Sequence, residues 1–407
     1  MARVAERLGK LAETLTSFSS SSSSNSSEMS VQAPDNLPWN PNCARFPSRK
    51  ELPKLPGAPE DAAWVWGKDD ALGRLNLLTP QRVKAAAGDI QTGEMVRLDL
   101  PLNVPENPAF GREQFQHHIK CLIPGVAYDD TYTLNTQSGT QWDGFRHFAH
   151  IDSQTFYNGT TAADILGDDA NHRCGIHDWA NHGIAGRGIL LDYRAYAESQ
   201  NNNYDPYTAH AITFSDLQAC AASQGLDLRP ESQGGDIKVG DILMVRSGFV
   251  QRYHELSPAA RKAGGERPKE ELQWAGLKQE DATLDWLHDC YFAALCGDSP
   301  TFECWPPVKE NGYMHQQILA LWGMPLGEMW DLETLATKCR AVGKWTFFVT
   351  SAPANVAGIF SPSLPLSLSL SLGFLCCLSI CGSSWANVDS LIKLGGVGSH
   401  ANATAIL

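Results

Sequence analysis

The sequence predicts a domain of the α/β or α+β class, because buried strands alternate with helices without a strict βαβ spacing. Four short apolar runs are typical of buried strands: ILLD at 189–192, ILMVRS at 242–247, FAALCG at 292–297 and TFFVTS at 346–351. Helical patterns lie between such runs, for example in Asp281–Asp289 and Leu332–Val342. Gly-Asp pairs at 240–241 and 297–298 indicate turns beside the strands.

Composition limits the classes of protein to which the chain can belong. Of its 407 residues, 43% are hydrophobic and 19% are charged, and a chain of this length can bury a large core without disulfides. The 45 acidic residues outnumber the 32 Lys and Arg by 13, which disfavours nucleic acid as a partner, because phosphate binding needs basic patches. The 11 cysteines form no CxxC motif, so we expect reduced thiols in a cytoplasmic protein.

The N-terminal region differs in composition from the centre of the chain. Residues 1–35 include nine serines between Ser17 and Ser27, and such a segment cannot bury enough apolar surface to fold alone. We expect a disordered extension here. A mitochondrial presequence, the alternative to cytoplasmic location, is disfavoured by Glu6 and Glu13, because presequences are poor in acidic residues.

A segment near the C-terminus, 359–395, does not fit the surrounding sequence. Leu and Ser alternate strictly through Leu366–Leu372, as a CTCTCT pyrimidine tract would encode, and removal of the segment leaves the continuous text SAPANVAG-GVGSHANATAIL. We interpret the segment as a retained intron, which makes 36–358 and 396–407 one domain. The alternative is a true insertion or a membrane anchor, because 361–381 is apolar enough for a membrane helix.

The densest group of polar side chains lies in NTQSGTQWDGFRHFAH, Asn135–His150. Four of them fall at odd positions and would share one face of an extended strand: Gln137, Gln141, Asp143 and His147. Trp142 and Phe148 would lie on the other face, with Arg146, which we expect to be structural. One carboxylate, one histidine and two amides on one face suit a hard metal ion or a polar substrate. The alternative is a polar edge strand whose hydrogen bonds are satisfied.

Two further groups of residues are candidates for a site. The stretch from Gly297 to Glu328 offers four polar side chains: Asp298, Glu303, His315 and Glu328. His315 opens a helical apolar pattern, where a single histidine is more often a cap or a surface residue than a ligand. Three aromatic residues of the first group can form an apolar wall for an aromatic substrate, or pack in the core instead: Trp142, Phe145 and Phe148.

Taken in order, these motifs resemble the cyclase family, the metal-dependent hydrolases that include bacterial kynurenine formamidase and isatin hydrolase. The family motif HxGTHxDxPxH corresponds to QSGTQWDGFRH at 137–147, a variant most similar to the fungal branch of the family. Other segments that resemble the family are WVWGKDDALGRLNLLTP at 64–80, GRGILLD at 186–192, GDILMVRSGF at 240–249, GDSPTFE at 297–303 and the late H…E pair His315 and Glu328.

The resemblance implies a swivelling β/β/α domain with a mixed sheet and flanking helices. It implies His147 as the proton-transfer residue and assigns the metal ligands to Gln137, Gln141, Asp143, His315 and Glu328. Substrate contacts are expected from Trp142, Phe145, Phe148, Asp298 and Glu303. Two glutamines stand where the family has histidines, and an amide oxygen is a weak, hard ligand compared with imidazole. We therefore expect a divalent metal, Mn or Zn with Mg as an alternative, or no metal at all.

The function that the resemblance implies is hydrolysis of a C–N bond in a formyl or cyclic amide, as an arylformamidase performs in the breakdown of tryptophan to kynurenine. The alternatives are a cyclase, dehydratase or lactone hydrolase of fungal secondary metabolism, and a metal-free binding protein on the same fold. The sequence has no GxSxG nucleophile elbow and no phosphate-binding glycine motif, which disfavours a serine hydrolase and a nucleotide-binding protein. We expect a small-molecule substrate and a homo-oligomer.

Overall fold

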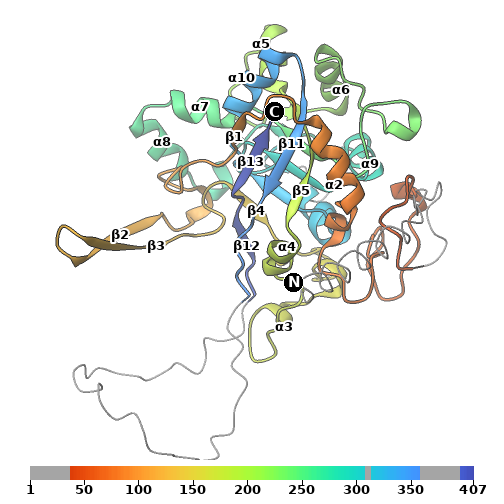
Figure 1. Ribbon diagram of the computed structural model, residues 1–407, viewed down its shortest axis with the longest axis horizontal. Coiled ribbons are helices and arrows are strands. Elements are labelled where there is room, and N and C mark those ends of the chain that lie inside the picture. The colour runs from red at the N-terminus through yellow and green to blue at the C-terminus, as the bar shows by residue number, and fades with distance from the viewer. Residues whose placement is uncertain (1–36, 308–312, 358–394) are drawn as a thin grey trace, which may run out of the picture.

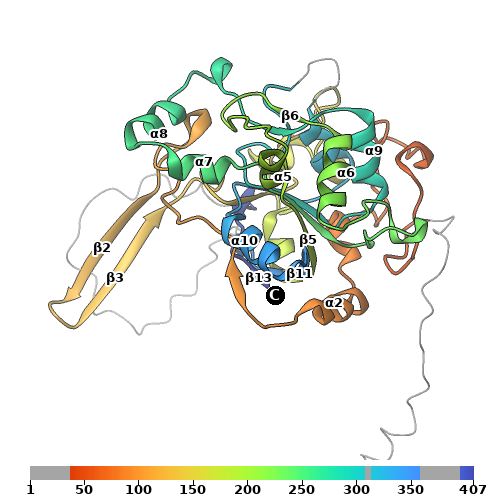
Figure 2. The ribbon, with the colours of Figure 1, turned by 90° about the horizontal axis from the view of Figure 1, so that it is seen from above.

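A computed structural model describes residues 37–307, 313–357 and 395–407, and its centre is a nine-stranded mixed sheet with helices on both sides (Figures 1 and 2). The strands of this sheet are β1 (Met95–Arg97), β4 (Gln141–Asp143), β5 (Ile184–Leu191), β7 (Ile242–Val245), β9 (Ala294–Gly297), β10 (Leu326–Glu328), β11 (Thr346–Ser351), β12 (Gly398–His400) and β13 (Ala403–Ile406). Their order is β1-β13-β11-β5-β7-β9-β10-β4-β12. The α/β class predicted from the sequence is thereby confirmed.

The helices cover the two faces of the sheet. They are α2 (Pro80–Ala86), α3 (Ala162–Ile165), α4 (Ile176–His182), α5 (Tyr193–Ser199), α6 (Phe214–Ser223), α7 (Phe249–Glu255), α8 (Pro258–Gly265), α9 (Asp281–Asp289) and α10 (Glu333–Val342). Two short pairs of strands lie outside the main sheet: β2 (Gln116–Ile123) with β3 (Ala127–Thr133), and β6 (Ala211–Ile212) with β8 (Gly276–Leu277). The helices predicted from periodicity, α9 and α10, lie where the sequence placed them.

The four parallel strands β5, β7, β9 and β10 form the centre of the sheet and are buried on both faces. Leu190 and Met244 pack into one hydrophobic cluster with α10, whereas Leu191 and Leu243 pack into a second cluster with α6 and α9. Strands that are covered on both faces need apolar residues at every position. This is why the apolar runs of β5, β7 and β9 stand out in the sequence. The fourth run, β11, is antiparallel to its neighbours and its burial alternates, and all four predicted strands are confirmed.

The sheet is curled, so that its two ends approach each other. Strands β12 and β13 are separated only by Ala401 and Asn402, yet β12 pairs with β4 at one end of the sheet and β13 pairs with β1 and β11 at the other. A flat sheet of nine strands cannot place two such neighbours so far apart. The last thirteen residues of the chain therefore join the two ends of the sheet.

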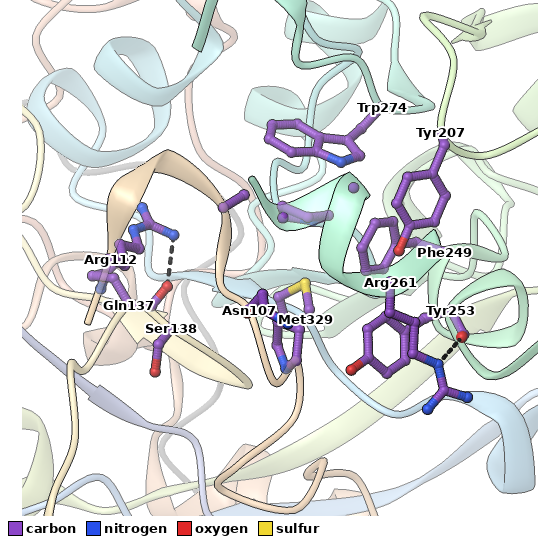
Figure 3. A pocket seen from close by; sticks show the side chains of 15 residues that line it. Asn107, Arg112, Gln137, Ser138, Tyr207, Phe249, Tyr253, Arg261, Trp274 and Met329 are labelled. Atoms are coloured by element: carbon purple, nitrogen blue, oxygen red, sulfur yellow. Dashed lines mark hydrogen bonds between the residues drawn. The ribbon is translucent and has the colours of Figure 1, made fainter. Parts of the chain in front are cut away.

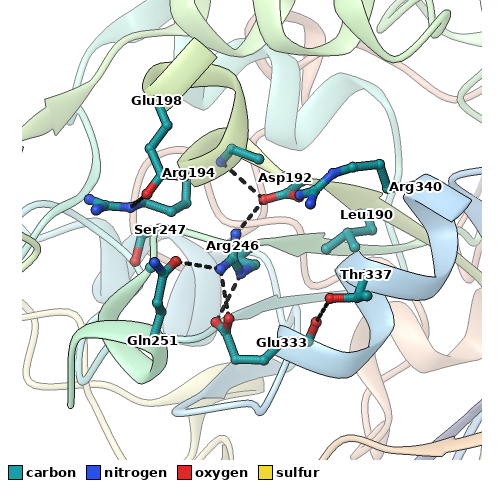
Figure 4. A network of polar contacts seen from close by, with 12 residues as sticks. Leu190, Asp192, Arg194, Glu198, Arg246, Ser247, Gln251, Glu333, Thr337 and Arg340 are labelled. Carbon is teal, nitrogen blue, oxygen red and sulfur yellow. Dashed lines mark hydrogen bonds and ion pairs between the residues drawn. The ribbon is translucent and has the colours of Figure 1, made fainter. Parts of the chain in front are cut away.

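A buried network of ion pairs joins the carboxyl ends of β5 and β7 to α10 (Figure 4). The guanidinium of Arg246 donates to Asp192 Oδ1 at 2.7 Å and to both carboxylate oxygens of Glu333 at 2.6 and 2.9 Å. It also donates to Gln251 Oε1 at 2.7 Å, and Arg340 donates to Asp192 Oδ2. Only 7% of the Arg246 side chain and 2% of the Asp192 side chain are exposed, so each charge depends on its partners for solvation.

Residues 359–394 of the segment interpreted as a retained intron lie outside the described residues, but the residues on either side of them meet. The backbone N–H of Gly396 donates to the carbonyl oxygen of Val356 at 3.0 Å, and the N–H of Ala352 donates to the oxygen of Asn402 at 3.2 Å. Arg146, predicted to be structural, donates to the carbonyl oxygens of Asn171, Arg173 and Gly395. The described residues before and after this segment are therefore adjacent in the fold.

We expect a chain that lacks 359–395 to keep the fold and to be more soluble. With Gly358 joined to Gly396, the bond from Gly396 N to Val356 O becomes the i+3 to i bond of a β-turn, and Gly358 occupies the position at which glycine is favoured. The measurement compares soluble yield and melting temperature of the two chains. Equal yield, or a lower melting temperature of the shortened chain, would contradict the expectation.

No helix in the described ranges is long and apolar enough to cross a membrane. The membrane anchor considered for 361–381 and the N-terminal extension 1–35 both lie outside the described residues.

Candidate active site

Strands β4 and β10 bring the two predicted groups of polar residues together. The strands pair in antiparallel register, with Glu328 directly opposite Gln141 and Leu326 directly opposite Asp143. Residues opposite each other in an antiparallel pair project to the same face of the sheet. The carboxylate of Glu328 therefore lies beside the side chains of Gln141 and Asp143, although Gln141 and Glu328 are 187 positions apart in the sequence.

The expected strand over Asn135–His150 is wrong in its extent, because only Gln141–Asp143 forms a strand. Gln137 lies in a turn before this strand. A second turn follows the strand and leads to His147, whose backbone N–H donates to the carbonyl oxygen of Gly144 at 2.9 Å. The predicted common face nevertheless holds for the polar residues. Phe148 is the exception: its ring centre lies 5.6 Å from that of His315, on the side of the site.

Asp143, His315 and Glu328 form a buried cluster whose ligand atoms lie within 4.8 Å of one another. His315 Nε2 is 3.2 Å from Glu328 Oε1 and 3.6 Å from Asp143 Oδ2. The three side chains are between 0% and 9% exposed. Two carboxylates and one imidazole nitrogen at this spacing can hold a divalent cation.

The two glutamines of the motif border this cluster. Gln141 Nε2 donates to Gln137 Oε1 at 2.9 Å, to Glu328 Oε2 at 3.0 Å and to Asp143 Oδ1 at 3.2 Å. The amide of Gln141 thus stabilises both carboxylates by hydrogen bonding. Among the described residues, Asp143 Oδ2 and Gln141 Oε1 are buried oxygens without a hydrogen-bond donor.

The lack of a donor at these two oxygens shows whether the site can accommodate a metal ion. A buried oxygen without a donor costs free energy, and a cation held by Asp143, His315 and Glu328 would satisfy Asp143 Oδ2. These residues supply carboxylate oxygens and one imidazole nitrogen, and the amide of Gln141 would add a third oxygen if it turned its Oε1 to the ion, a set that suits Mn or Mg better than Zn. The residues therefore fit a single hard divalent cation. Gln137 Oε1 accepts the bond from Gln141 and lies at the edge of this set.

Glu303 positions the imidazole of His315. Its Oε1 lies 2.7 Å from His315 Nδ1, which directs Nε2 towards Asp143 and Glu328. Burial lowers the pKa of His315, but the carboxylates of Glu303 and Glu328 outweigh it and hold the pKa well above its usual range. A carboxylate on the second nitrogen of a ligand histidine fixes the tautomer and strengthens the ligand. This placement supports an orienting role for Glu303, which was predicted to contact substrate.

His147 lies at the edge of the cluster, with its Nε2 3.9 Å from Asp143 Oδ2. Burial lowers the pKa of His147, which favours the neutral imidazole needed to accept a proton. Burial raises the pKa of Asp143, but His147 and His315 outweigh it and bring the pKa below its usual value. Burial and the neighbouring charge of Asp143 raise the pKa of Glu328 to about 7. The site thus combines a charged carboxylate with a neutral histidine.

Three predicted substrate contacts are placed elsewhere. Trp142 and Phe145 are fully buried in the hydrophobic core, where Trp142 Nε1 donates to Ser351 Oγ and Phe145 packs on Tyr157 and Trp179. Asp298 is also buried, and its two oxygens accept bonds from Ser247 N and Oγ and from Gly248 N. These side chains have no surface for a substrate to touch, so this part of the prediction is corrected.

A pocket lined with aromatic residues adjoins the cluster (Figure 3). Arg112 and Gln137 lie at one end, and Tyr207, Phe249 and Tyr253 lie at the other. The guanidinium of Arg112 donates to the carbonyl oxygen of Gln137 at 2.6 Å. Burial lowers the pKa of Arg112 and outweighs the opposing charges of Glu328 and Asp143, so the pKa lies below its usual value.

Nothing in the sequence predicted this pocket. Arg112 lies outside the motif, and its side chain meets the motif through the backbone oxygen of Gln137. The aromatic residues come from α7 and from two separate loops, so that neither spacing nor periodicity links them to the site.

The fold is similar to that of solved structures. A crystal structure described as a novel cyclase is 24% identical, covers 85% of this chain and 99% of its own, and has a TM-score of 0.64. Isatin hydrolase A from Ralstonia solanacearum is 14% identical, with 80% and 97% of the two chains covered and a TM-score of 0.44. An isatin hydrolase bound to the product analogue thioisatinate is 13% identical, with 81% and 97% covered and a TM-score of 0.44.

A search of curated proteins found no match. The family model named Cyclase matches residues 96–304, which is more than half of the chain. The matched part contains the motif at 137–147 and Glu303, while His315 and Glu328 lie beyond its C-terminal limit. The chain belongs to the cyclase family.

Proposed function

We propose that the protein is a metal-assisted hydrolase that cleaves the C–N bond of a formyl or cyclic amide, as an arylformamidase does. The observation that carries the proposal is the buried cluster of Asp143, His315 and Glu328, in which Asp143 Oδ2 lacks a donor and faces the neutral His147. Membership of the cyclase family supports it. The proposed pathway is the breakdown of tryptophan to kynurenine, and the proposed location is the cytoplasm.

Asp143, Glu328, His315 and the amide oxygen of Gln141 would hold the metal, which we propose to be Mn before Zn or Mg. Such an ion supplies an activated water and polarises a carbonyl group. His147 Nε2 accepts the proton of the attacking water and returns it to the leaving nitrogen. Phe148, next to His315, gives an aromatic substrate an apolar surface.

His147→Ala tests the proposal. We expect this variant to lose about 10²- to 10⁴-fold in kcat on an amide substrate, because it lacks the group that moves the proton. Its metal content and melting temperature should stay unchanged, since His147 is not among the proposed ligands. The measurement is a screen of formyl amides, cyclic amides and lactones, followed by steady-state kinetics on the best substrate.

His150→Ala is the matched control. His150 lies three residues further along the chain, and its Nδ1 is 2.9 Å from Ser153 Oγ in an exposed turn. Its removal should leave kcat unchanged. Full activity of His147→Ala, or an equal loss in both variants, would contradict a proton-transfer role for His147.

One observation favours a second candidate, a metal-free binding protein. The amide of Gln141 donates to both Asp143 and Glu328, and His315 carries a proton between them, so that the carboxylates are already compensated by groups of the chain itself. The metal content of the purified protein separates the two functions. About one ion per chain supports the hydrolase, and none after dialysis against Mn, Mg and Zn supports the binding protein.

A further inference from the structure

A cavity of about 430 Å³ lies at the amino ends of the parallel strands, at the opposite end of the sheet from the metal cluster. Its walls come from segments that are distant in the sequence: residues 44–51, the helix α2, the start of β5, and the loops that precede β7 and β9. We propose that this cavity is a second ligand site, which binds a small organic anion with an apolar body. The site is separate from the metal cluster, and the proposal does not depend on the proposed reaction.

The size and the apolar lining of the cavity suit a small molecule. Pockets for such ligands have volumes of about 300–1,000 Å³ and are mostly apolar, with a few polar groups that fix the orientation of the ligand. The apolar lining includes Phe46, Leu78, Ala86, Ile237 and Tyr291. Four of these are buried, and the ring of Phe46 stacks on that of Tyr291 with their centres 4.6 Å apart. The body of a ligand would therefore meet an apolar, partly aromatic surface.

Arg187 brings a buried guanidinium to the lining of the cavity. Its side chain is only 10% exposed, and its Nη2 donates to the carbonyl oxygen of Asp236 at 2.9 Å. Among the described residues, Nη1 is a buried nitrogen without a hydrogen-bond partner, because its ion-pair partner, Asp241 Oδ2, is 3.7 Å away. A buried donor without an acceptor costs free energy. An anionic oxygen of a ligand would supply the missing acceptor.

The two carboxylates near Arg187 leave its charge incompletely compensated. Asp89 Oδ2 lies 3.7 Å from Arg187 Nε, while the other oxygen of Asp89 is 3.0 Å from Lys344 Nζ and accepts a bond from Thr346 Oγ1 at 3.2 Å. Asp241 is fully buried, and burial raises its pKa to about 7. Close to neutral pH this carboxyl is therefore protonated in part of the molecules. A bound anion would complete the compensation of Arg187.

The pairing of the charges in the lining, rather than their number, favours an anion. The lining contains four basic and five acidic residues. Within the described ranges, Arg187 is the only one of the four basic residues that forms an ion pair. Arg82 donates to backbone carbonyl oxygens, which carry no net charge, and Arg45 and Lys238 are exposed. A ligand in the cavity would thus meet cations that have no carboxylate partner.

The remaining acidic residues of the lining are already stabilised. Glu51 Oε2 accepts bonds from the backbone N–H and the hydroxyl of Ser48 at 3.1 and 2.8 Å. Asp289 Oδ1 accepts a bond from the backbone N–H of Arg49 at 2.7 Å. Glu231 is exposed, so water solvates its carboxylate. These groups need no cation from a ligand, whereas the basic residues lack anions.

Binding of 2-naphthoate to the full chain tests the proposal, and the neutral ketone 2-acetylnaphthalene is the comparison compound of similar shape. Isothermal titration calorimetry should show binding of the acid. The ketone should bind at least about 10-fold more weakly, because it lacks the charge that pairs with the guanidinium of Arg187. Equal affinity of the two compounds, or no binding of the acid, would overturn the proposal.

Two substitutions at exposed positions of the lining assign the binding to this cavity. Lys238→Glu reverses a charge and should weaken the binding of 2-naphthoate at least about 10-fold. Lys84→Glu is the matched control, since it makes the same change at an exposed position of α2 outside the lining and should leave the affinity unchanged. Ala85→Trp should abolish binding, because the indole would occupy the cavity.

Circular dichroism melting of the three variants checks that each remains folded. Unchanged affinity in either Lys238→Glu or Ala85→Trp would place the ligand outside this cavity and overturn the proposal. A loss in Lys84→Glu as large as that in Lys238→Glu would overturn it as well, because the effect would then come from the net charge of the chain.

Discussion

Asp143→Asn is expected to abolish the binding of a divalent metal. Asp143 is fully buried, and its Oδ2 is a buried oxygen without a donor that faces His315 and His147. Asparagine keeps the shape of the side chain but removes the charge that a hard cation requires. Metal content, measured by mass spectrometry on protein that has never met a chelator, should fall from about one ion per chain to nearly none.

The control for this experiment is Asp241→Asn. Asp241 is equally buried, but it lies before β7, at the opposite end of the parallel strands from the cluster. Asp241 Oδ2 lies 3.7 Å from the buried Arg187, so this substitution likewise removes one buried negative charge, and melting curves of both variants separate a loss of stability from a loss of metal. Unchanged metal content in Asp143→Asn, with metal present in the unaltered chain, would show that Asp143 is not a ligand.

Arg246→Ala is expected to cause the largest loss of stability. The substitution leaves the buried Asp192 with only the half-exposed Arg340 of its two cations, and it removes from the partly buried Glu333 the arginine that pairs with it. Breaking a buried ion pair from one side typically costs about 3–5 kcal/mol, most of which is the penalty of the uncompensated charge. Urea unfolding followed by circular dichroism should show this fall in the free energy of unfolding.

An exposed arginine gives the matched comparison. Arg252 pairs with Asp205 and Glu255, but 35% of its side chain and more than 40% of both partners are exposed. Water screens these pairs, so Arg252→Ala should cost no more than about 1 kcal/mol. A loss in Arg246→Ala that does not exceed the loss in Arg252→Ala would mean that the buried network contributes nothing specific.

The core of the fold was predictable because burial leaves a local signal in the sequence. The strands β5, β7, β9 and β11 are apolar runs, and α9 and α10 have helical periodicity, so each could be located from its own residues. The edges of the sheet could not be located in this way. Strands such as β1, β4 and β12 have three residues each, too few to show a period, and they exist because of partners distant in the sequence.

The polar half of the candidate site was predictable for a related reason. Gln137, Gln141, Asp143 and His147 lie in one short motif, whereas the meeting with His315 and Glu328 followed only from the resemblance to the family. The predicted substrate contact of Trp142 and Phe145 was wrong, because the sequence does not distinguish an aromatic residue that lines a pocket from one that packs in the core. The role of Glu303 and the place of Arg112 depend on contacts with His315 and with a backbone oxygen, and no spacing encodes such contacts.

Strands β12 and β13 follow the other seven strands of the nine-stranded sheet in the sequence, and this order has a consequence for synthesis on the ribosome. Strand β4, which carries Gln141 and Asp143, lies between β10 and β12, and β1 is held by β13. A nascent chain can form the central parallel strands early, but β4 lacks its outer neighbour until β12 emerges. Each molecule therefore completes this edge of the sheet only after β12 is synthesised, and a transcript truncated before β12 would lose both closing strands at once.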